Sequence, residues 1–344
     1  MDNQVNSVRY KFILIVFLFN IVKIHTQDLK DWQKKITLPD TAFNVDSNYW
    51  IKGSIFNIGF NRVGLYNWAG GGQNSMSVQG LTNNYLLLKH RKISWMNQLT
   101  LSYGIIRNGF GDSIPWLKND DRIELTSKFG RKTKYKWDYS ILFNFRTQFE
   151  EGFNSPDDVT ENNYFSKFFS PAYPLLAMGF DYKKDQEFSC FLSPATLKST
   201  VVLDEFLYSQ GVFGVEAGRK LRVEAGGYLN LNYRKASFLN VRDLNLRSNL
   251  SLFSNYVEQP ENIDVTWETL ISYKLKKLFS ITFSSYLIYD HDTKIPRFNK
   301  DGSPVHLLNS QGFPYLDENG NKIQKRGAAV QFKEVLTLGI LLSF

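Results

Sequence analysis

Apolar and polar residues alternate with a period of two along most of the chain. In residues 135–149 the odd positions are aromatic or aliphatic except Thr147, and the even positions are polar except Leu142. The segments 263–275 and 279–289 show the same alternation, and helical spacing explains none of these runs. Because successive side chains of a β-strand point to opposite faces, the pattern predicts strands with one apolar and one polar face.

The alternation predicts twelve strands, each longer than the usual strand of a soluble sheet. Their expected ranges are 50–64, 75–89, 93–107, 120–130, 135–149, 172–183, 187–202, 220–234, 239–256, 262–275, 279–290 and 328–344. An even number of long strands is typical of a closed barrel whose strands cross a membrane at a tilt. The predicted fold class is therefore all-β, a transmembrane antiparallel β-barrel of about twelve strands with both termini periplasmic, formed by residues 50–344.

The predicted connections alternate between short and long, which independently supports this topology. The short connections and their edges are rich in Lys and Arg and cover 90–92, 131–134, 184–186, 235–238 and 276–278. The long connections include 108–119, 150–171, 203–219 and 291–327. Short turns of bacterial barrels lie in the periplasm, so we expect the basic turns on that side. The longest connection, 291–327, is long enough to fold over or into the mouth of the barrel.

Both ends of the sequence have features of an exported membrane protein. Near the N-terminus a basic segment precedes the apolar stretch 12–22, which suits a signal peptide and is too short to span a bilayer. We predict a signal peptide over 1–26 and a polar periplasmic lead-in over 27–49, with a retained N-terminal anchor as the alternative. The last strand ends on Phe344, which looks like the signal that outer-membrane barrels present to their assembly machinery.

Composition and charge exclude several other classes of protein. The mean hydropathy of −0.30 excludes a helical membrane bundle, and the single cysteine, Cys190, excludes an internal disulfide. Much of the net charge of +8 resides in the basic turns, so no nucleic-acid partner is expected. The sequence has no Walker loop, zinc spacing or EF-hand, so we expect no cofactor and no metal. The expected location is the cell outer membrane, where the partners are membrane lipid and, during insertion, the barrel-assembly machinery.

The polar strand faces are expected to place a set of charged residues in the lumen. These are Arg122, Glu124, Lys128, Lys136, Asp138, Arg146, Arg222, Glu224, Arg234, Arg247, Asp264, Glu268, Lys274 and Lys333. Arg122 and Glu124 share a strand face, as do Arg222 and Glu224, which favours ion pairing. Two interpretations stay open, a charged channel or a salt-bridge network that fills a narrow barrel. Twelve strands give a lumen between the filled eight-stranded and the open sixteen-stranded case.

Catalytic chemistry has little support in the sequence. An Asp-His pair such as Asp290-His291 can activate water, and His306 is a further histidine in the same predicted loop. Such a pair is more often the polar start of an exposed loop, and no lipase or protease pattern surrounds this one. We therefore expect no catalytic residue and no enzyme, and keep an outer-membrane hydrolase as a third hypothesis.

A glycine-rich hairpin motif is predicted between the first two strands. Its residues are Asn67, Trp68, Gly70, Gly71 and Gly72, and glycines permit positive φ in such a turn. Together with 120–130, 165–173, 252–256, 262–265 and 330–335, this motif resembles a Bacteroidota family catalogued as domain of unknown function 3078 (DUF3078). The resemblance covers roughly residues 45–344 and implies an outer-membrane protein. That family has no assigned activity, so the resemblance assigns no functional residue.

The sequence leaves two main functional hypotheses. The first is a channel or porin-like conduit for small solutes, lined by the charged strand faces. The second is a non-conducting barrel that serves as a subunit of an envelope assembly or secretion complex, with another envelope protein as its partner. In the second case the partner is expected to contact the lead-in 27–49 or the basic turns.

Overall fold

In the computed structural model the described residues are 49–63, 74–109, 114–161, 163–184, 187–275, 279–297, 299, 303–316, 320 and 322–343. The predicted signal peptide, the lead-in up to residue 48, the hairpin motif at 67–72 and Phe344 lie outside these residues.

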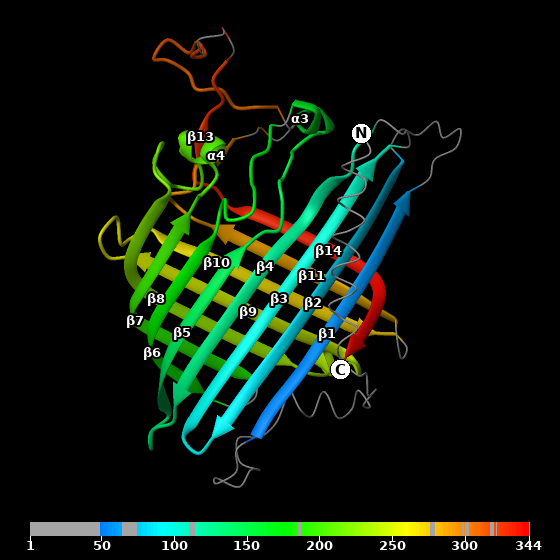
Figure 1. Cartoon of the computed structure of the whole chain (residues 1–344), viewed down its shortest axis with the longest axis vertical. Coiled ribbons are helices and arrows are strands. Elements are labelled where there is room, and N and C mark those ends of the chain that lie inside the picture. The colour runs from blue at the N-terminus through cyan, green and yellow to red at the C-terminus, as the bar shows by residue number, and fades with distance from the viewer. Residues whose placement is uncertain are drawn as a thin grey trace.

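Twelve antiparallel strands close into a barrel (Figure 1). They are β1 (Tyr49–Val63), β2 (Ser75–His90), β3 (Ile93–Asn108), β4 (Leu117–Arg131), β5 (Trp137–Thr147), β6 (Tyr173–Lys183), β7 (Phe188–Val201), β8 (Leu221–Lys235), β9 (Leu244–Asn255), β10 (Ile263–Lys274), β11 (Phe279–Tyr289) and β14 (Gln331–Ser343). Each strand pairs with the next in this series, and β14 also pairs with β1 to close the ring. The predicted closed antiparallel β-barrel of twelve strands is confirmed, and the periplasmic position of both termini stays a prediction.

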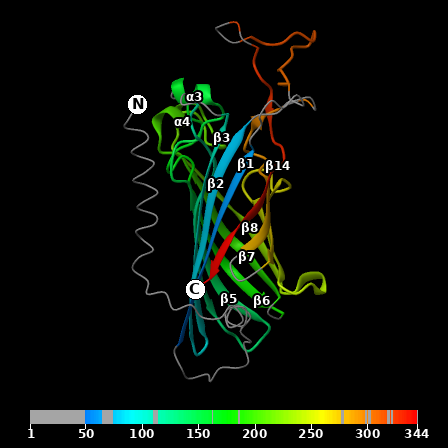
Figure 2. The ribbon, with the colours of Figure 1, turned by 90° about the vertical axis from the view of Figure 1, so that its right-hand side faces the viewer.

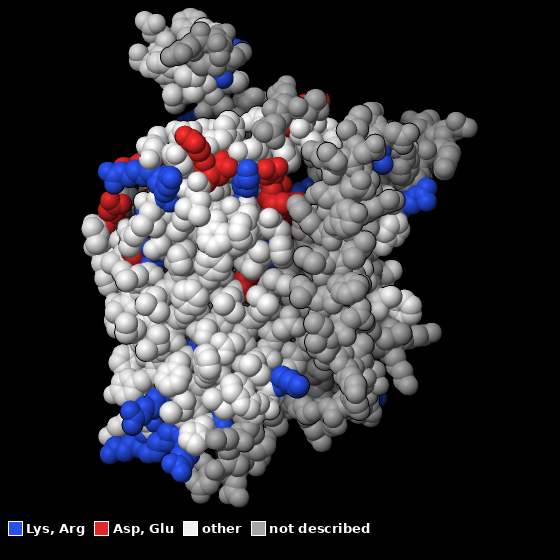
Figure 3. Space-filling model, in the orientation of Figure 1, with Lys and Arg blue, Asp and Glu red and all other residues white. Residues whose placement is uncertain are grey.

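The alternation along each strand separates an apolar outer face from a more polar inner face. On β5, Tyr139 and Ile141 are exposed on the outside, whereas Ser140 and Leu142 are buried on the inside. On β14, Leu336 and Leu338 are 67% and 59% exposed. In Figure 3 the band between the two rims of the barrel carries few charged side chains. Exposed leucine and tyrosine in such numbers are unusual for a surface in water and suit contact with an apolar medium.

The two rims of the barrel differ in their connections. The described residues of the short turns, 91–92, 132–136, 184, 187, 236–243 and 275, lie at one rim, called the short-turn rim. The described parts of the longer connections lie at the other, the long-loop rim. Exposed basic residues gather at the short-turn rim, and Figure 3 shows blue side chains at the lower edge. They include Arg91, Lys92, Arg131, Lys132 and Lys134.

One predicted strand starts later than the sequence pattern indicates. The segment 239–243 was expected in the ninth strand but belongs to a turn that contains the 3-10 helix η2 (Phe238–Asn240). Leu239 and Asp243 have φ of 54° and 65°, in the left-handed region, which is incompatible with a strand. This short-turn connection is therefore longer than predicted.

Two of the long loops build a small cap on the long-loop rim. The loop after β5 contains the helix α3 (Pro156–Glu161), and the loop after β7 contains α4 (Glu205–Ser209). Val202, Leu207 and Val215 form a buried core of their own beneath these loops. No helix within the described residues is long and apolar enough to cross a membrane.

The longest loop forms an arm rather than a plug. Two short strands, β12 (Ile295–Pro296) and β13 (Arg326–Gly327), pair at its base, and bridges such as His306 to Gln324 continue the ribbon outward. Figures 1 and 2 show the arm projecting beyond the long-loop rim. The base of this loop, with Ile295 and Arg326, lines the cavity at the mouth, whereas the ribbon beyond it projects outward.

Candidate functional site in the barrel lumen

The barrel encloses a cavity of about 2460 Å³ that receives side chains from all twelve barrel strands. Lys89 and Lys274 line it at the short-turn rim, and Tyr164 and Asp290 line it at the long-loop rim. A small apolar cluster of Leu142, Ala177 and Phe191 fills part of one wall. The lumen is therefore partly filled and partly open, and its lining extends from rim to rim.

Most of the predicted lumen residues lie on this lining. The cavity is lined by Arg122, Glu124, Lys128, Arg146, Arg234, Arg247, Asp264, Glu268, Lys274 and Lys333. Glu224 lines a smaller pocket at the mouth, and Arg222 forms an ion pair with Glu224 there.

Two further predicted lumen residues line neither this cavity nor the pocket at the mouth. Lys136 is exposed and precedes β5, which begins at Trp137 rather than at residue 135. The carboxylate of Asp138 accepts a hydrogen bond from the backbone N–H of Thr133 at 2.9 Å. Lys136 therefore lies in the short turn before β5, whereas Asp138 is the second residue of β5, on the same face as Ser140, with its carboxylate bonded to that turn.

Two polar contacts cross the whole width of the lumen. Arg122 Nη1 on β4 lies 2.6 Å from Glu268 Oε1 on β10. Arg146 on β5 donates a hydrogen bond to the hydroxyl of Tyr286 on β11. In the strand order, β4 and β10 have five strands between them on either side, and so do β5 and β11. Arg122, Arg146, Glu268 and Tyr286 thus form a crossbar that connects opposite walls.

Neighbouring groups hold the crossbar in place. Glu124 lies 3.5 Å from Arg122, as the shared strand face predicted, and accepts a hydrogen bond from Asn144 at 3.0 Å. The Arg146 guanidinium lies 5.0 Å from the centre of the Tyr173 ring, within the range of cation–π attraction. The crossbar narrows the lumen, and together with Glu124 it presents two arginines and two carboxylates.

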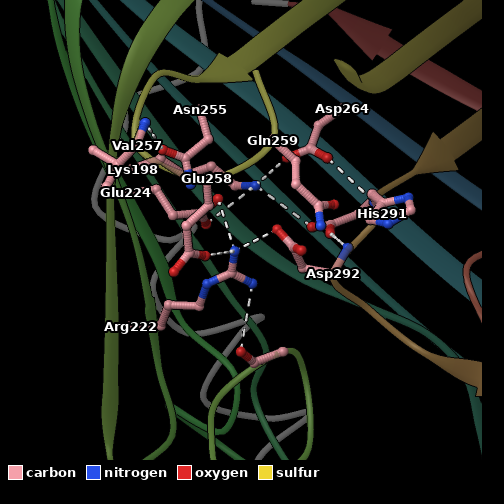
Figure 4. A network of polar contacts seen from close by, with 12 residues as sticks. Lys198, Arg222, Glu224, Asn255, Val257, Glu258, Gln259, Asp264, His291 and Asp292 are labelled. Atoms are coloured by element: carbon pink, nitrogen blue, oxygen red, sulfur yellow. Dashed lines mark hydrogen bonds and ion pairs between the residues drawn. The ribbon is translucent and has the colours of Figure 1, made fainter. Parts of the chain in front are cut away.

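A second charged cluster lies at the mouth on the long-loop rim (Figure 4). Lys198 contacts Asp264 at 2.6 Å and both Glu224 and Asp290 at 3.5 Å. Arg222 contacts Glu224 at 3.2 Å and also pairs with Asp292. Carboxylates outnumber cations here, so the mouth is acidic whereas the short-turn rim is basic.

The electrostatics of the loop residues follow from these contacts. Burial opposes ionisation of Asp290, but Lys198 and two backbone N–H groups hold the pKa of this carboxyl below its usual range. In the cap, hydrogen bonds to Glu151 and Asp204 raise the pKa of Lys167. These groups are therefore charged near neutral pH.

The histidines do not form the arrangement that hydrolysis requires. The ring of His291 lies 3.4 Å from the Tyr289 hydroxyl, and the Asp290 carboxylate accepts hydrogen bonds from the backbone N–H groups of Asp292 and Thr293. His306 lies in the arm. Within the described ranges no group of three His, Cys, Asp or Glu could hold a metal ion. The absence of enzyme activity stays a prediction.

The sequence pattern missed several of the groups that shape the site. Lys198 was not predicted because a bulge between Ser193 and Thr196 shifts the alternation of β7 by the time the chain reaches it. Tyr286 lies on the polar face of the alternating segment 279–289. The alternation therefore indicated that its side chain faces the lumen. Lys128 was predicted, but its partner Asp181, at 2.5 Å, was not.

Comparison with known proteins identifies a family for part of the chain. Residues 60–153 match the family model described as protein of unknown function (DUF3078). Over this segment the chain is similar to the DUF3078 family. The resemblance seen in the sequence is confirmed over that range, which includes the motif at 120–130. A search of curated proteins found no match.

The DUF3078 segment contributes one side of the crossbar, Arg122 and Arg146, whereas Glu268 and Tyr286 lie outside the match. Among solved structures, the "TodX monoaromatic hydrocarbon channel deltaS2 mutant" is similar over 90% of this chain and 93% of that chain, with 8% identity and a TM-score of 0.30.

Proposed function

We propose that this protein is an outer-membrane barrel that forms a narrow conduit for small polar solutes. The membrane location is supported by the apolar outer face between two charged rims. The conduit is supported by one observation above all, the cavity of about 2460 Å³ whose lining extends from the short-turn rim to the long-loop rim.

The crossbar defines what kind of conduit this is. Because Arg122 contacts Glu268 across the lumen, a solute passes only beside that pair or after its separation. Charged groups in a narrow aqueous passage set both the conductance and the ion selectivity. We therefore expect small solutes and a low conductance rather than the bulk flow of a wide porin.

Planar-bilayer recording of the refolded mature protein tests the proposal. The expected result is reproducible, small conductance steps from protein whose folded state is verified by heat-modifiable mobility on a gel. The matched control is Arg219→Ala/Glu216→Ala, which removes an ion pair in the loop after β7. These two side chains are 72% and 75% exposed and lie outside the lumen. The control variant should conduct as the wild type does, and silence from folded wild-type protein would overturn the proposal.

A second candidate function is a non-conducting subunit that binds another envelope protein. It is favoured by the arm, where Phe313 and Leu316 are 65% and 58% exposed. This candidate predicts that a folded but silent barrel co-purifies with a defined envelope protein, and that deletion of 299–325 releases this protein. Conductance steps that persist after the deletion would instead favour the conduit.

A further inference from the structure

Two arginines on the lumen wall have no side-chain partner among the described residues. Arg234 on β8 and Arg247 on β9 line the cavity and are half-buried. Neither side chain makes an ion pair or a hydrogen bond with any residue in the described part of the chain. By contrast, Arg122 and Lys198 each contact a carboxylate oxygen at 2.6 Å. The two arginines therefore differ from Arg122 and Lys198, whose charges are met by carboxylates.

The two unpaired arginines are also direct neighbours. Arg234 and Arg247 occupy the same register position of the β8–β9 pair. Like charges opposite each other on neighbouring strands destabilise a sheet. The repulsion between the two arginines costs stability, and neither guanidinium is bonded to a carboxylate of the described residues. Such a cost at a lumen position indicates that the arginine pair serves the function of the protein rather than its stability.

An unpaired hydroxyl faces the same region from the opposite wall. The Tyr85 hydroxyl on β2 is buried and has no hydrogen-bond partner in the described residues. The charges that act on this hydroxyl are those of Arg234 and Arg247. In the strand order β2 and β8 have five strands between them on either side, so Tyr85 and Arg234 belong to opposite walls. The Tyr85 ring packs over Gly53 of the neighbouring strand.

The surroundings favour a negatively charged occupant. Glu268 attracts Arg247, but its carboxylate is bonded to Arg122. Lys89, Lys235 and Lys274 line the same end of the cavity and add to the positive field. The nearby carboxylates of Asp181 and Glu187 are paired with Lys128 and Lys235. An anion that enters from the short-turn rim is therefore attracted toward the two arginines.

We propose that Arg234, Arg247 and Tyr85 form a binding site for a small oxyanion, a phosphate or a carboxylate group, in the short-turn half of the lumen. The planar fork of a guanidinium matches the oxygens of both groups, and a tyrosine hydroxyl donates to either. Binding also relieves the repulsion between the two arginines. The role of this site in selecting solutes rests on the proposed conduit, whereas the binding itself does not.

Calorimetric titration of the refolded chain in a zwitterionic detergent at low salt tests the site. Inorganic phosphate and acetate are the two probes, because one carries a phosphate group and the other a carboxylate group. We expect saturable binding of at least one probe, and the tighter one identifies the group. Arg234→Gln/Arg247→Gln should weaken binding by about tenfold or more, because charged hydrogen bonds are lost. Tyr85→Phe, which removes only the hydroxyl, should weaken it less.

Folding of the double variant is not at risk, because the substitutions remove like charges. As a second readout, the bound probe should raise the melting temperature of the wild type and of Arg219→Gln, but not that of Arg234→Gln/Arg247→Gln. Absence of binding by both probes, or equal binding by the double variant and the wild type, would overturn the site. An equal loss of binding in Arg219→Gln would also overturn the site, because the loss would then follow from the reduced net charge and not from the position of the arginines.

The two proposals fail in different ways. Oxyanion binding in micelles together with silent bilayers retains the site and removes the conduit. Conductance steps without binding of either probe retain the conduit and remove the site.

Discussion

At the scale of single residues, one buried hydroxyl joins the two loops of the cap. Ser170 is fully buried, and its Oγ accepts hydrogen bonds from the backbone N–H groups of Leu203 at 3.0 Å and Asp204 at 2.8 Å. Asp204 in turn caps α4 by accepting a hydrogen bond from the N–H of Leu207. The loop after β5 thus holds the start of the loop after β7.

Ser170→Ala should therefore destabilise the cap. It leaves the N–H of Asp204 without an acceptor and that of Leu203 with only Phe169 O, at 3.2 Å. A lost hydrogen bond of this kind costs about 1–3 kcal/mol. The measurement is the urea concentration at which the cap becomes sensitive to protease in micelles. Ser166→Ala is the matched control, because the Ser166 Oγ is also buried but has no hydrogen-bond partner in the described residues. Equal effects of the two substitutions would contradict this account of Ser170.

Residue spacing in the sequence predicted contacts within a strand but not across the barrel. The shared face of Arg122 and Glu124 correctly indicated that the two side chains would meet. The contact between Arg122 and Glu268 could not be predicted, because it requires the two residues to lie at the same height along the barrel axis on opposite walls. That height is set by strand register and tilt, which period-two alternation does not encode.

At the scale of elements, a double irregularity shapes β6, β7 and β8. The register shifts between Met178 and Phe180 and again between Ser193 and Thr196. The Ser193 Oγ lies 2.8 Å from Met178 O and 2.9 Å from Ala195 O and donates its one hydrogen to either carbonyl, which holds the bulge in place. The bulge also turns Lys198 toward the mouth cluster.

Gly179 is required for this arrangement. A Cβ at this position would lie 2.0 Å from Leu192 O and 2.6 Å from the Ser193 Cα. We expect Gly179→Ala to destabilise the barrel by about 1–3 kcal/mol, because the backbone must shift to relieve the overlap. The readout is the yield of heat-modifiable protein after refolding.

Gly80→Ala in β2 is the control for that substitution. A Cβ at Gly80 meets only Tyr103 O, at 3.9 Å, which is an ordinary contact. Its refolding yield should equal that of the wild type. If Gly179→Ala refolds equally well, the bulge is not the constraint described above.

The existence of the strands was predictable from the sequence, but the irregular elements were not. Twelve alternating segments gave twelve strands, whereas the 3-10 turn at 238–240 and the paired arm had no period-two signal. Ser237 and Leu239 have φ in the left-handed region although neither is glycine. The sequence therefore lacks the glycine that usually indicates such a turn.

At the scale of the whole molecule, charge changes along the lumen. Next to the long-loop rim, Lys198 and Arg222 lie among a larger number of carboxylates. The crossbar of Arg122, Arg146, Glu268 and Tyr286 follows, and beyond it the unpaired Arg234 and Arg247 face the basic short-turn rim. A solute on this route meets an acidic mouth, a balanced constriction and a basic exit.

The most direct test of the conduit is the single-channel conductance of Arg122→Ala/Glu268→Ala beside the wild type and Arg219→Ala/Glu216→Ala. Each double variant removes one arginine and one glutamate, so the net charge is unchanged and only the location differs. The account predicts larger conductance steps from the crossbar variant and wild-type steps from the loop variant. Identical steps from all three folded proteins would show that ions do not pass the crossbar, and would contradict a conduit through this lumen.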